Sequence, residues 1–115
     1  MEQLNILMVD DQPAKLLTYE SMLSQMGERL IKAETASEAL AHLLKEDIAV
    51  VLMDVNMPEL DGFELAAMIR QHPRFERTAI IFISAILQTD IDRLRGYESG
   101  AVDYIPVPEI GRAHV

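Results

Sequence analysis

Hydrophobic residues gather into short runs that alternate with stretches of helical spacing. The most continuous run is Ala49–Met53, which ends at the carboxylate of Asp54. An unbroken apolar run bounded by turn residues is typical of a strand buried on both faces of a sheet. The same pattern predicts four further strands, over residues 4–9, 29–33, 79–83 and 101–105. The run over 29–33 has mixed polarity, so we expect it at an edge of the sheet.

Stretches with helical spacing separate these strands. Pro13 suits the first turn of a helix, where a missing N–H costs nothing, and Gly27 is a plausible stop for that helix. The sequence Thr35–Glu38 fits a capping box that opens a second helix. Two more helices are predicted to begin at Asp61 and Thr89 and to end before Pro73 and Gly100, respectively.

Alternation of strands and helices predicts an α/β fold with a parallel sheet, right-handed crossovers and helices on both faces. The chain of 115 residues is short enough to be one domain, spanning residues 1–115. The tail from Pro108 to Val115 can form only about two turns of helix. We therefore expect a last helix that is short, or a chain that belongs to a longer protein.

Composition excludes several kinds of function. Ten Lys and Arg face 19 Asp and Glu, a net charge of −9, which disfavours direct binding to nucleic acid. The absence of cysteine excludes disulfides and thiolate zinc sites. No apolar run approaches the roughly 18 residues of a membrane-spanning helix, and the N-terminus lacks the basic region of a signal peptide. We expect no membrane insertion and, by default, a cytoplasmic location.

Acidic residues follow two of the predicted strands. Asp10 and Asp11 end the first strand, Asp54 ends the third and Ser84 ends the fourth. Carboxyl ends of parallel strands lie on one rim of the sheet, where ligands bind in open α/β folds. If the first and third strands are neighbours, the three carboxylates meet there. Two carboxylates about 4 Å apart repel by roughly 4 kcal/mol at an effective dielectric of 20, so the cluster must take up a proton or a cation. Oxygen ligands without His or Cys favour Mg²⁺.

A carboxylate beside Mg²⁺ is also a possible nucleophile toward phosphorus, forming an aspartyl phosphate. Each residue has a plainer interpretation as well: Asp10 and Asp11 as caps for the following helix, and Asp54 and Ser84 as turn residues. Their occurrence at matching ends of alternating strands favours a metal and phosphoryl site over these separate structural roles.

Four motifs together resemble the receiver domain of two-component response regulators over essentially the whole chain. They are the pair Asp10–Asp11, the block Met53–Pro58 with Asp61–Gly62, the pair Ser84–Ala85, and Gly100–Ala101 followed by Asp103–Tyr104. The resemblance implies a three-layer flavodoxin-like (βα)5 fold with a five-stranded parallel sheet of order 2-1-3-4-5. It also implies a phosphoacceptor module in His-Asp signal transduction rather than a turnover enzyme.

The resemblance assigns a role to each matching residue. It implies that Asp54 accepts the phosphoryl group. It implies Mg²⁺ binding by the side chains of Asp11 and Asp54, by the backbone carbonyl of Asn56, and by Asp10 mainly through water.

Switching and partner contacts follow from the same resemblance. Ser84 is the expected hydroxyl that turns toward the phosphoryl group, and Tyr104 the aromatic residue that swings inward with it. The phosphoryl donor would be a histidine kinase or a phosphotransfer protein, and the parent protein could be a hybrid histidine kinase. The fourth helix and fifth strand would form the output surface and a possible homodimer contact.

One departure from the family pattern concerns the lysine expected before Pro108. That position holds Val107, which cannot make a charged contact. Lys15, Lys32 and Lys45 are the only lysines, and none matches the missing one. The alternative interpretation is therefore a pseudo-receiver that contacts proteins without phosphorylation.

Two further positions bear on function. A Mg²⁺-dependent phosphohydrolase, the other alternative, usually has a second acid where this chain has Asn56. Ile86, two residues after Ser84, would hinder an attacking water if it overhangs the site. We therefore hypothesise slow autodephosphorylation.

Overall fold

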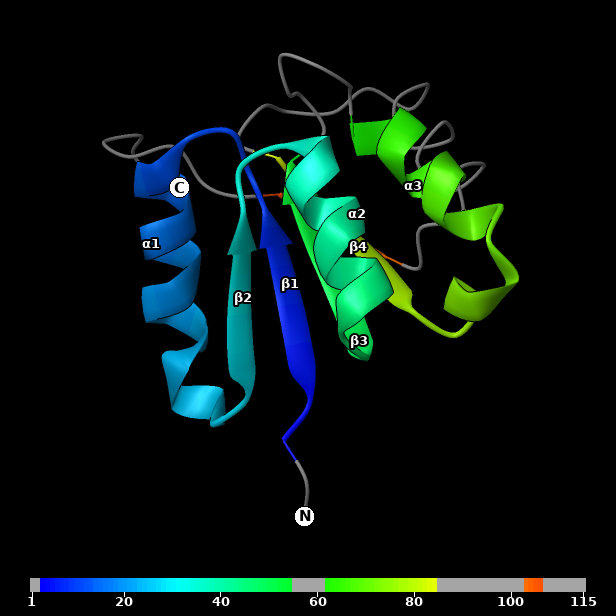
Figure 1. Cartoon of the computed structure of the whole chain (residues 1–115). Coiled ribbons are helices and arrows are strands. Elements are labelled where there is room, and N and C mark those ends of the chain that lie inside the picture. Colours follow the sequence, from blue (N-terminus) through cyan, green and yellow to red (C-terminus); the bar gives the residue numbers. More distant parts are fainter. Residues whose placement is uncertain (1–2, 55–61, 85–102, 107–115) are drawn as a thin grey trace.

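Five parallel strands form the centre of the fold (Figure 1). The computed structural model describes residues 3–54, 62–84 and 103–106. The strand order is β2-β1-β3-β4-β5, which confirms the α/β fold class and the order that the resemblance implied. The strands are β1 (Asn5–Val9), β2 (Arg29–Ala33), β3 (Ile48–Asp54), β4 (Ala79–Ser84) and β5 (Asp103–Pro106).

Helices cover both faces of the sheet. Figure 1 shows α1 on one side, and α2 and α3 on the other. The helical elements are α1 (Pro13–Leu23), α2 (Ala36–Lys45), α3 (Gly62–Arg70) and two short 3₁₀ helices, η1 (Ser24–Met26) and η2 (Pro73–Phe75). The helix predicted from Thr89 and the short last helix lie outside the described residues.

The strands alternate between two hydrophobic cores. In β1, Leu7 and Val9 pack with α2 and α3, whereas Ile6 and Met8 pack with α1. In β3 the side chains alternate in the same way: Val51 and Met53 lie on the face covered by α2 and α3, and Val50 and Leu52 lie on the face covered by α1. Since successive side chains of a strand point to opposite faces, the next residue of each strand, Asp10 and Asp54, belongs to the α1 side.

Register brings these two carboxylates side by side. Strands β1 and β3 pair in parallel, with Val9 opposite Met53. Continuing the pairing by one residue places Asp10 opposite Asp54. Two neighbouring strands of the sheet thus end in carboxylates at the same level and on the same face.

The helices begin and end at the capping and breaking residues that the sequence predicts. Thr35 accepts a hydrogen bond from the backbone N–H of Glu38 at 3.1 Å, and the Glu38 side chain accepts one from the N–H of Glu34 at 2.7 Å. Gly27 has φ of 75°, a left-handed conformation that suits glycine after a helix. Pro73 begins η2 three residues after α3 ends.

Helical spacing in the sequence predicts that Met26, Leu44 and Met68 lie on buried helix faces, but all three are exposed. Met26 is 59% exposed, Leu44 55% and Met68 44%. Met26 belongs to η1, because α1 already ends at Leu23, so it leaves the buried stripe. Leu44 and Met68 lie next to Leu43 and Ile69, which are at most 1% exposed. A step of one residue turns the side chain by about 100° around the helix, away from the core.

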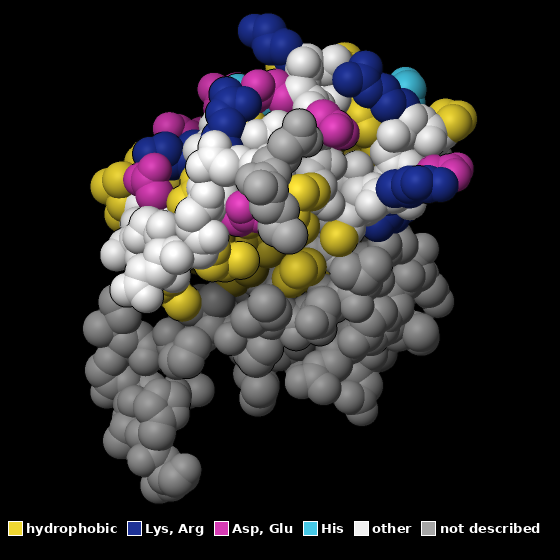
Figure 2. Space-filling view, turned by 90° about the horizontal axis from the view of Figure 1, so that it is seen from below, with side chains coloured by type: hydrophobic (Ala, Val, Ile, Leu, Met, Phe, Trp, Pro, Cys, Tyr) yellow, Lys and Arg dark blue, Asp and Glu magenta, His cyan; other side chains and the backbone are white. Residues whose placement is uncertain are grey.

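The end of the molecule where the strands begin carries charges of both signs. Figure 2 views this end, and it shows Lys, Arg, Asp and Glu side chains interspersed around hydrophobic ones. Arg29 and Glu46 form an ion pair there at 2.7 Å. Among the described residues, no helix combines the length and apolar character that a membrane crossing requires.

Candidate functional site

Three carboxylates meet where β1 and β3 end. One oxygen from each of Asp10, Asp11 and Asp54 lies within 4.8 Å of the others. Asp10 is fully buried and Asp54 is 7% exposed, while Asp11 is half-buried. The structure thus brings together the three acidic residues that the sequence singles out, at the sheet edge where the parallel strands deliver them.

Asp10 is held by hydrogen bonds to both of its oxygens. Its Oδ1 accepts from the backbone N–H of Gln12 at 2.9 Å, and its Oδ2 accepts from the hydroxyl of Tyr19 at 2.8 Å. The bond to Gln12, the residue that precedes α1, has the form of an Asx turn. Asp10 therefore has a structural role in this turn, but it does not cap α1, because Gln12 occupies the cap position and the helix has no side-chain cap there.

Burial raises the pKa of Asp10 above its ordinary value. The hydrogen bonds from Gln12 and Tyr19 oppose this shift, the charge of Asp54 adds to it, and the charge of Lys15 reduces it. The pKa of Tyr19 is raised as well, first by burial and then by its hydrogen bond to Asp10. Tyr19 therefore remains protonated and donates to Asp10 throughout the physiological range.

Lys15 brings a positive charge to the cluster. Its Nζ lies 3.6 Å from Oδ2 of Asp54, with 34% of the lysine side chain and 10% of the aspartate side chain exposed. Lys15 is the third residue of α1, which begins at Pro13. The ammonium group therefore approaches the sheet edge from the first turn of the helix that covers this face.

The donor set fits a magnesium ion. Carboxylate oxygens are the ligands that Mg²⁺ prefers, and ligands on opposite sides of one ion are roughly 4 Å apart. Separations up to 4.8 Å suit a site in which some carboxylates bind directly and another binds through water. Asp10, whose two oxygens already accept hydrogen bonds, is the best placed for a water-mediated contact.

Several expected site residues lie outside what the structure describes. These are Asn56, Ile86 and Val107, together with the side chains of Ser84 and Tyr104. The backbone register nevertheless pairs Asp54 with Ile83, and Ser84 with Pro106. Ser84 is therefore the residue after the strand partner of Asp54, at the same edge of the sheet as the acidic cluster.

Lys15 and Tyr19 contact the cluster although the sequence does not single them out for it. Both come from α1 and are four residues apart, so they lie on one face of the helix. The available signal was Pro13, which sets the start of the helix two residues after Asp11. Pro13 therefore predicts that Lys15 lies in the first turn of the helix, but it does not predict the orientation of that helix on the sheet.

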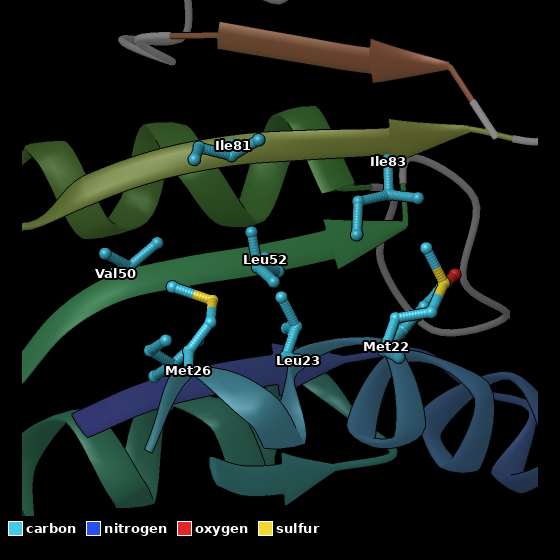
Figure 3. A pocket seen from close by; sticks show the side chains of 9 residues that line it. Met22, Leu23, Met26, Val50, Leu52, Ile81 and Ile83 are labelled. Carbon is cyan, nitrogen blue, oxygen red and sulfur yellow. The ribbon is translucent and has the colours of Figure 1, made fainter. Parts of the chain in front are cut away.

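A separate apolar groove lies on the same face of the sheet (Figure 3). Its volume is about 300 Å³. Met22, Leu23 and Met26 line it from one side, opposite side chains of β3 and β4 (Figure 3). Tyr19 lines it as well, and this residue therefore contacts both the groove and, through its hydroxyl, the acidic cluster.

Comparison with known proteins agrees with this geometry. The model of the response regulator receiver domain family matches residues 6–110. The gliding motility regulatory protein of Myxococcus xanthus is 31% identical over 110 residues, which cover 96% of this chain. The match spans only 14% of that relative's own length.

Solved structures share the fold over nearly the whole chain. Chemotaxis protein CheY4 of Vibrio cholerae superposes with a TM-score of 0.87 at 26% identity, covering 94% of this chain and 89% of that one. Response regulator TrrA of Thermotoga maritima, solved in complex with Mg²⁺ and beryllofluoride, has a TM-score of 0.80 at 28% identity, covering 95% and 90%. This chain belongs to the response regulator receiver domain family, the phosphoacceptor domains of two-component signalling.

Proposed function

We propose that Asp54 is the residue that accepts the phosphoryl group. The observation that carries this proposal is the meeting of Asp10, Asp11 and Asp54 within 4.8 Å at the ends of adjacent parallel strands. Asp54 is the last residue of β3, which lies between β1 and β4 and holds its carboxylate on a rigid backbone. A nucleophile on such a strand is positioned with little loss of conformational entropy.

The carboxylates of Asp10, Asp11 and Asp54 would hold Mg²⁺. The resemblance to receiver domains implies one more ligand, the backbone carbonyl of Asn56. When bound, the metal supplies positive charge that offsets the charge of the transferring phosphoryl group. In the transfer, an oxygen of Asp54 forms a bond to phosphorus while the bond from phosphorus to the donor's imidazole nitrogen breaks. The imidazole keeps the electron pair of the broken bond and takes up a proton.

The same proposal covers the partners and the switch. The phosphoryl donor is a histidine kinase or a phosphotransfer protein, as two-component signalling requires. Ser84 donates a hydrogen bond to the phosphoryl group, and Tyr104 swings inward when Ser84 moves. The surface formed by the fourth helix and β5 contacts the output partner or a second copy of the domain. Residues 1–115 form one domain that acts in the cytoplasm. It is a signalling module that neither turns over a substrate nor binds nucleic acid directly.

The pseudo-receiver alternative depends on Val107, which lies outside the described residues. The buried carboxylates support phosphorylation instead, because a module used only for protein contacts has no need to gather three like charges.

Labelling with a small phosphoryl donor tests the proposal. We expect acetyl phosphate and Mg²⁺ to add one phosphoryl group to the intact protein, as seen by mass spectrometry, with the modified peptide containing Asp54. The variant Asp54→Asn should remain unlabelled. The control Asp47→Asn, at an exposed acid just before β3, should be labelled like the wild type. Absence of label on the wild type, or persistent label on Asp54→Asn, would contradict the proposal.

A further inference from the structure

Lys15 stands at a position where helix electrostatics disfavour a lysine. The N-terminal turn of a helix carries partial positive charge and stabilises acidic side chains. The first turn of α1 holds no acidic residue, and it holds Lys15 instead. The ammonium group is balanced by the acidic cluster, because its Nζ lies 3.6 Å from Asp54 Oδ2. Its location is therefore explained by the cluster rather than by the helix.

Packing fixes the backbone from which Lys15 extends. Leu16, the next residue, is 2% exposed, and Tyr19, one turn later, is 7% exposed. Both belong to the core between α1 and the sheet. The hydroxyl of Tyr19 also donates a hydrogen bond to Oδ2 of Asp10. Leu16 and Tyr19, which both follow Lys15, thus anchor the start of α1 on the sheet, whereas the lysine side chain is about one-third exposed.

The other lysines of the chain lie elsewhere. Lys32 pairs with Glu20 at 3.1 Å on the outer strand β2, and Lys45 is in the last turn of α2, far from the end where β3 stops. In the second half of the sequence there is no lysine at all, and position 107 is a valine.

We propose that Lys15 is a catalytic residue of phosphoryl transfer, the fixed positive charge that attracts the anionic phosphoryl group to Asp54. This inference rests on the proposed function, since it takes Asp54 as the acceptor. Lys15 would then act from the first helix, in place of a lysine at position 107. A cation held beside the reacting oxygen stabilises the charge of the transferring group without reorganisation.

The charge of Lys15 has opposite effects on the two ligands of the site. It attracts the phosphoryl donor, which is an anion, and it repels Mg²⁺, which is a cation. Removing the charge should therefore slow phosphorylation and tighten Mg²⁺ binding. A purely structural role predicts otherwise, because a distorted cluster would bind Mg²⁺ more weakly.

The variants Lys15→Met and Lys15→Gln remove the charge and keep much of the side-chain length, whereas Lys15→Arg keeps the charge. Lys32→Met is the matched control, a lysine of similar exposure paired with a different carboxylate. Two quantities are measured on the full chain: the rate of labelling by acetyl phosphate at saturating Mg²⁺, and the dissociation constant for Mg²⁺ alone by calorimetric titration. Circular dichroism verifies that each variant is folded.

We expect Lys15→Met and Lys15→Gln to be labelled about tenfold more slowly. This effect is smaller than the roughly 100-fold loss caused by removing an enclosed charge-stabilising donor, because the lysine is partly exposed. Their Mg²⁺ dissociation constants should fall about threefold, as expected for removing one partly screened charge. Lys32→Met should match the wild type in both measurements. Lys15→Arg, which keeps the charge in a different donor geometry, should be labelled faster and bind Mg²⁺ more weakly than the two neutral variants.

Three results would overturn the inference. Equal labelling of the wild type and Lys15→Met at Asp54 would overturn it while leaving Asp54 as the acceptor. Slower labelling together with weaker Mg²⁺ binding would assign Lys15 a structural role. A wild type that is not labelled at Asp54 would overturn the proposed function and this inference together.

Discussion

At Asp10, two hydrogen bonds hold a carboxylate that burial drives toward the protonated form. The backbone N–H of Gln12 and the hydroxyl of Tyr19 each donate to one oxygen. Both bonds favour the charged form, and burial with the neighbouring charge of Asp54 opposes it. The two hydrogen bonds therefore limit the rise of the Asp10 pKa that burial and the charge of Asp54 cause.

Removing the Tyr19 hydroxyl tests this balance. Tyr19→Phe leaves Oδ2 of a fully buried Asp10 without the donor that it now has. We expect the free energy of unfolding to fall by about 1–3 kcal/mol, the usual cost of an unsatisfied buried polar group. Urea denaturation at neutral pH without Mg²⁺ measures it. In the double variant Tyr19→Phe/Asp10→Asn, the change in the free energy of unfolding should differ from the sum of the two single changes. A change equal to that sum would show that the Tyr19–Asp10 contact contributes no interaction energy.

The pH dependence of stability follows from the raised pKa of Asp10. The folded protein binds this proton more tightly than the unfolded chain, whose carboxyl has the ordinary value of 3.8. The corresponding stability is fully present below pH 3.8 and is lost as the pH rises through the raised pKa. Ionisation of this buried carboxyl as the pH rises therefore opposes folding in the absence of Mg²⁺.

Asp10→Asn should consequently be more stable than the wild type at neutral pH in EDTA, with the difference shrinking as the pH falls toward 4. Urea denaturation at a series of pH values measures both proteins. Thr78→Val, at another buried polar residue, is the control for a change without titration. A difference between Asp10→Asn and wild type that does not vary with pH would contradict the assignment.

Helices α1 and α2 begin in different ways, and only the start of α1 contacts the acidic cluster. At α2, Thr35 caps the first turn with its own side chain. At α1, the preceding Gln12 makes no side-chain cap, and its N–H donates to Asp10 instead. The start of α1 is therefore coupled to the acidic cluster, whereas the start of α2 depends on local sequence alone.

A substitution at the α2 cap should affect stability without affecting the site. Thr35→Ala removes the acceptor for the N–H of Glu38 and should lower the free energy of unfolding by about 1 kcal/mol. Thr35→Ser keeps the acceptor and should stay close to the wild type. Thermal denaturation measures stability, and Mg²⁺ titration should give one dissociation constant for all three proteins. Loss of Mg²⁺ affinity in Thr35→Ala would show that α2 and the site are coupled.

For the whole molecule, the proposed metal site lies at the ends of two adjacent strands, β1 and β3, so Mg²⁺ binding there should stabilise the entire sheet. Mg²⁺ binds a cluster that the unfolded chain lacks, and a concentration of 100 times the dissociation constant adds about 2.7 kcal/mol. We expect the midpoint of thermal unfolding to rise with Mg²⁺ and to return with EDTA. Asp11→Asn and Asp54→Asn should lose most of this rise.

The net charge of −9 requires a control, because any salt screens repulsion among acidic residues. Sodium chloride at matched ionic strength should raise the midpoint equally in the wild type and in both variants. A rise with Mg²⁺ no greater than that with sodium chloride would argue against a specific site.

Much of the fold follows from local patterns. Apolar runs predicted β1, β3 and β4 within one or two residues, and Pro13, Gly27 and Thr35 marked helix ends. The exposed Met26, Leu44 and Met68 were misplaced because hydrophobic spacing alone does not decide which of two adjacent apolar residues faces the core. That choice depends on how each helix is rotated against the sheet.

The acidic cluster follows from the sequence once β1 and β3 are neighbours, as they are in the sheet. Asp10 and Asp54 end apolar strands, the two-residue period of a strand selects their face, and parallel strands bring their carboxyl ends to one edge. The contacts of Lys15 and Tyr19 were decided only by the tertiary structure. They depend on the angle and height at which α1 crosses the sheet, and these are set by the packing of Leu16 and Tyr19 against β1 and β3. No local pattern encodes that packing, because it is a property of both surfaces together.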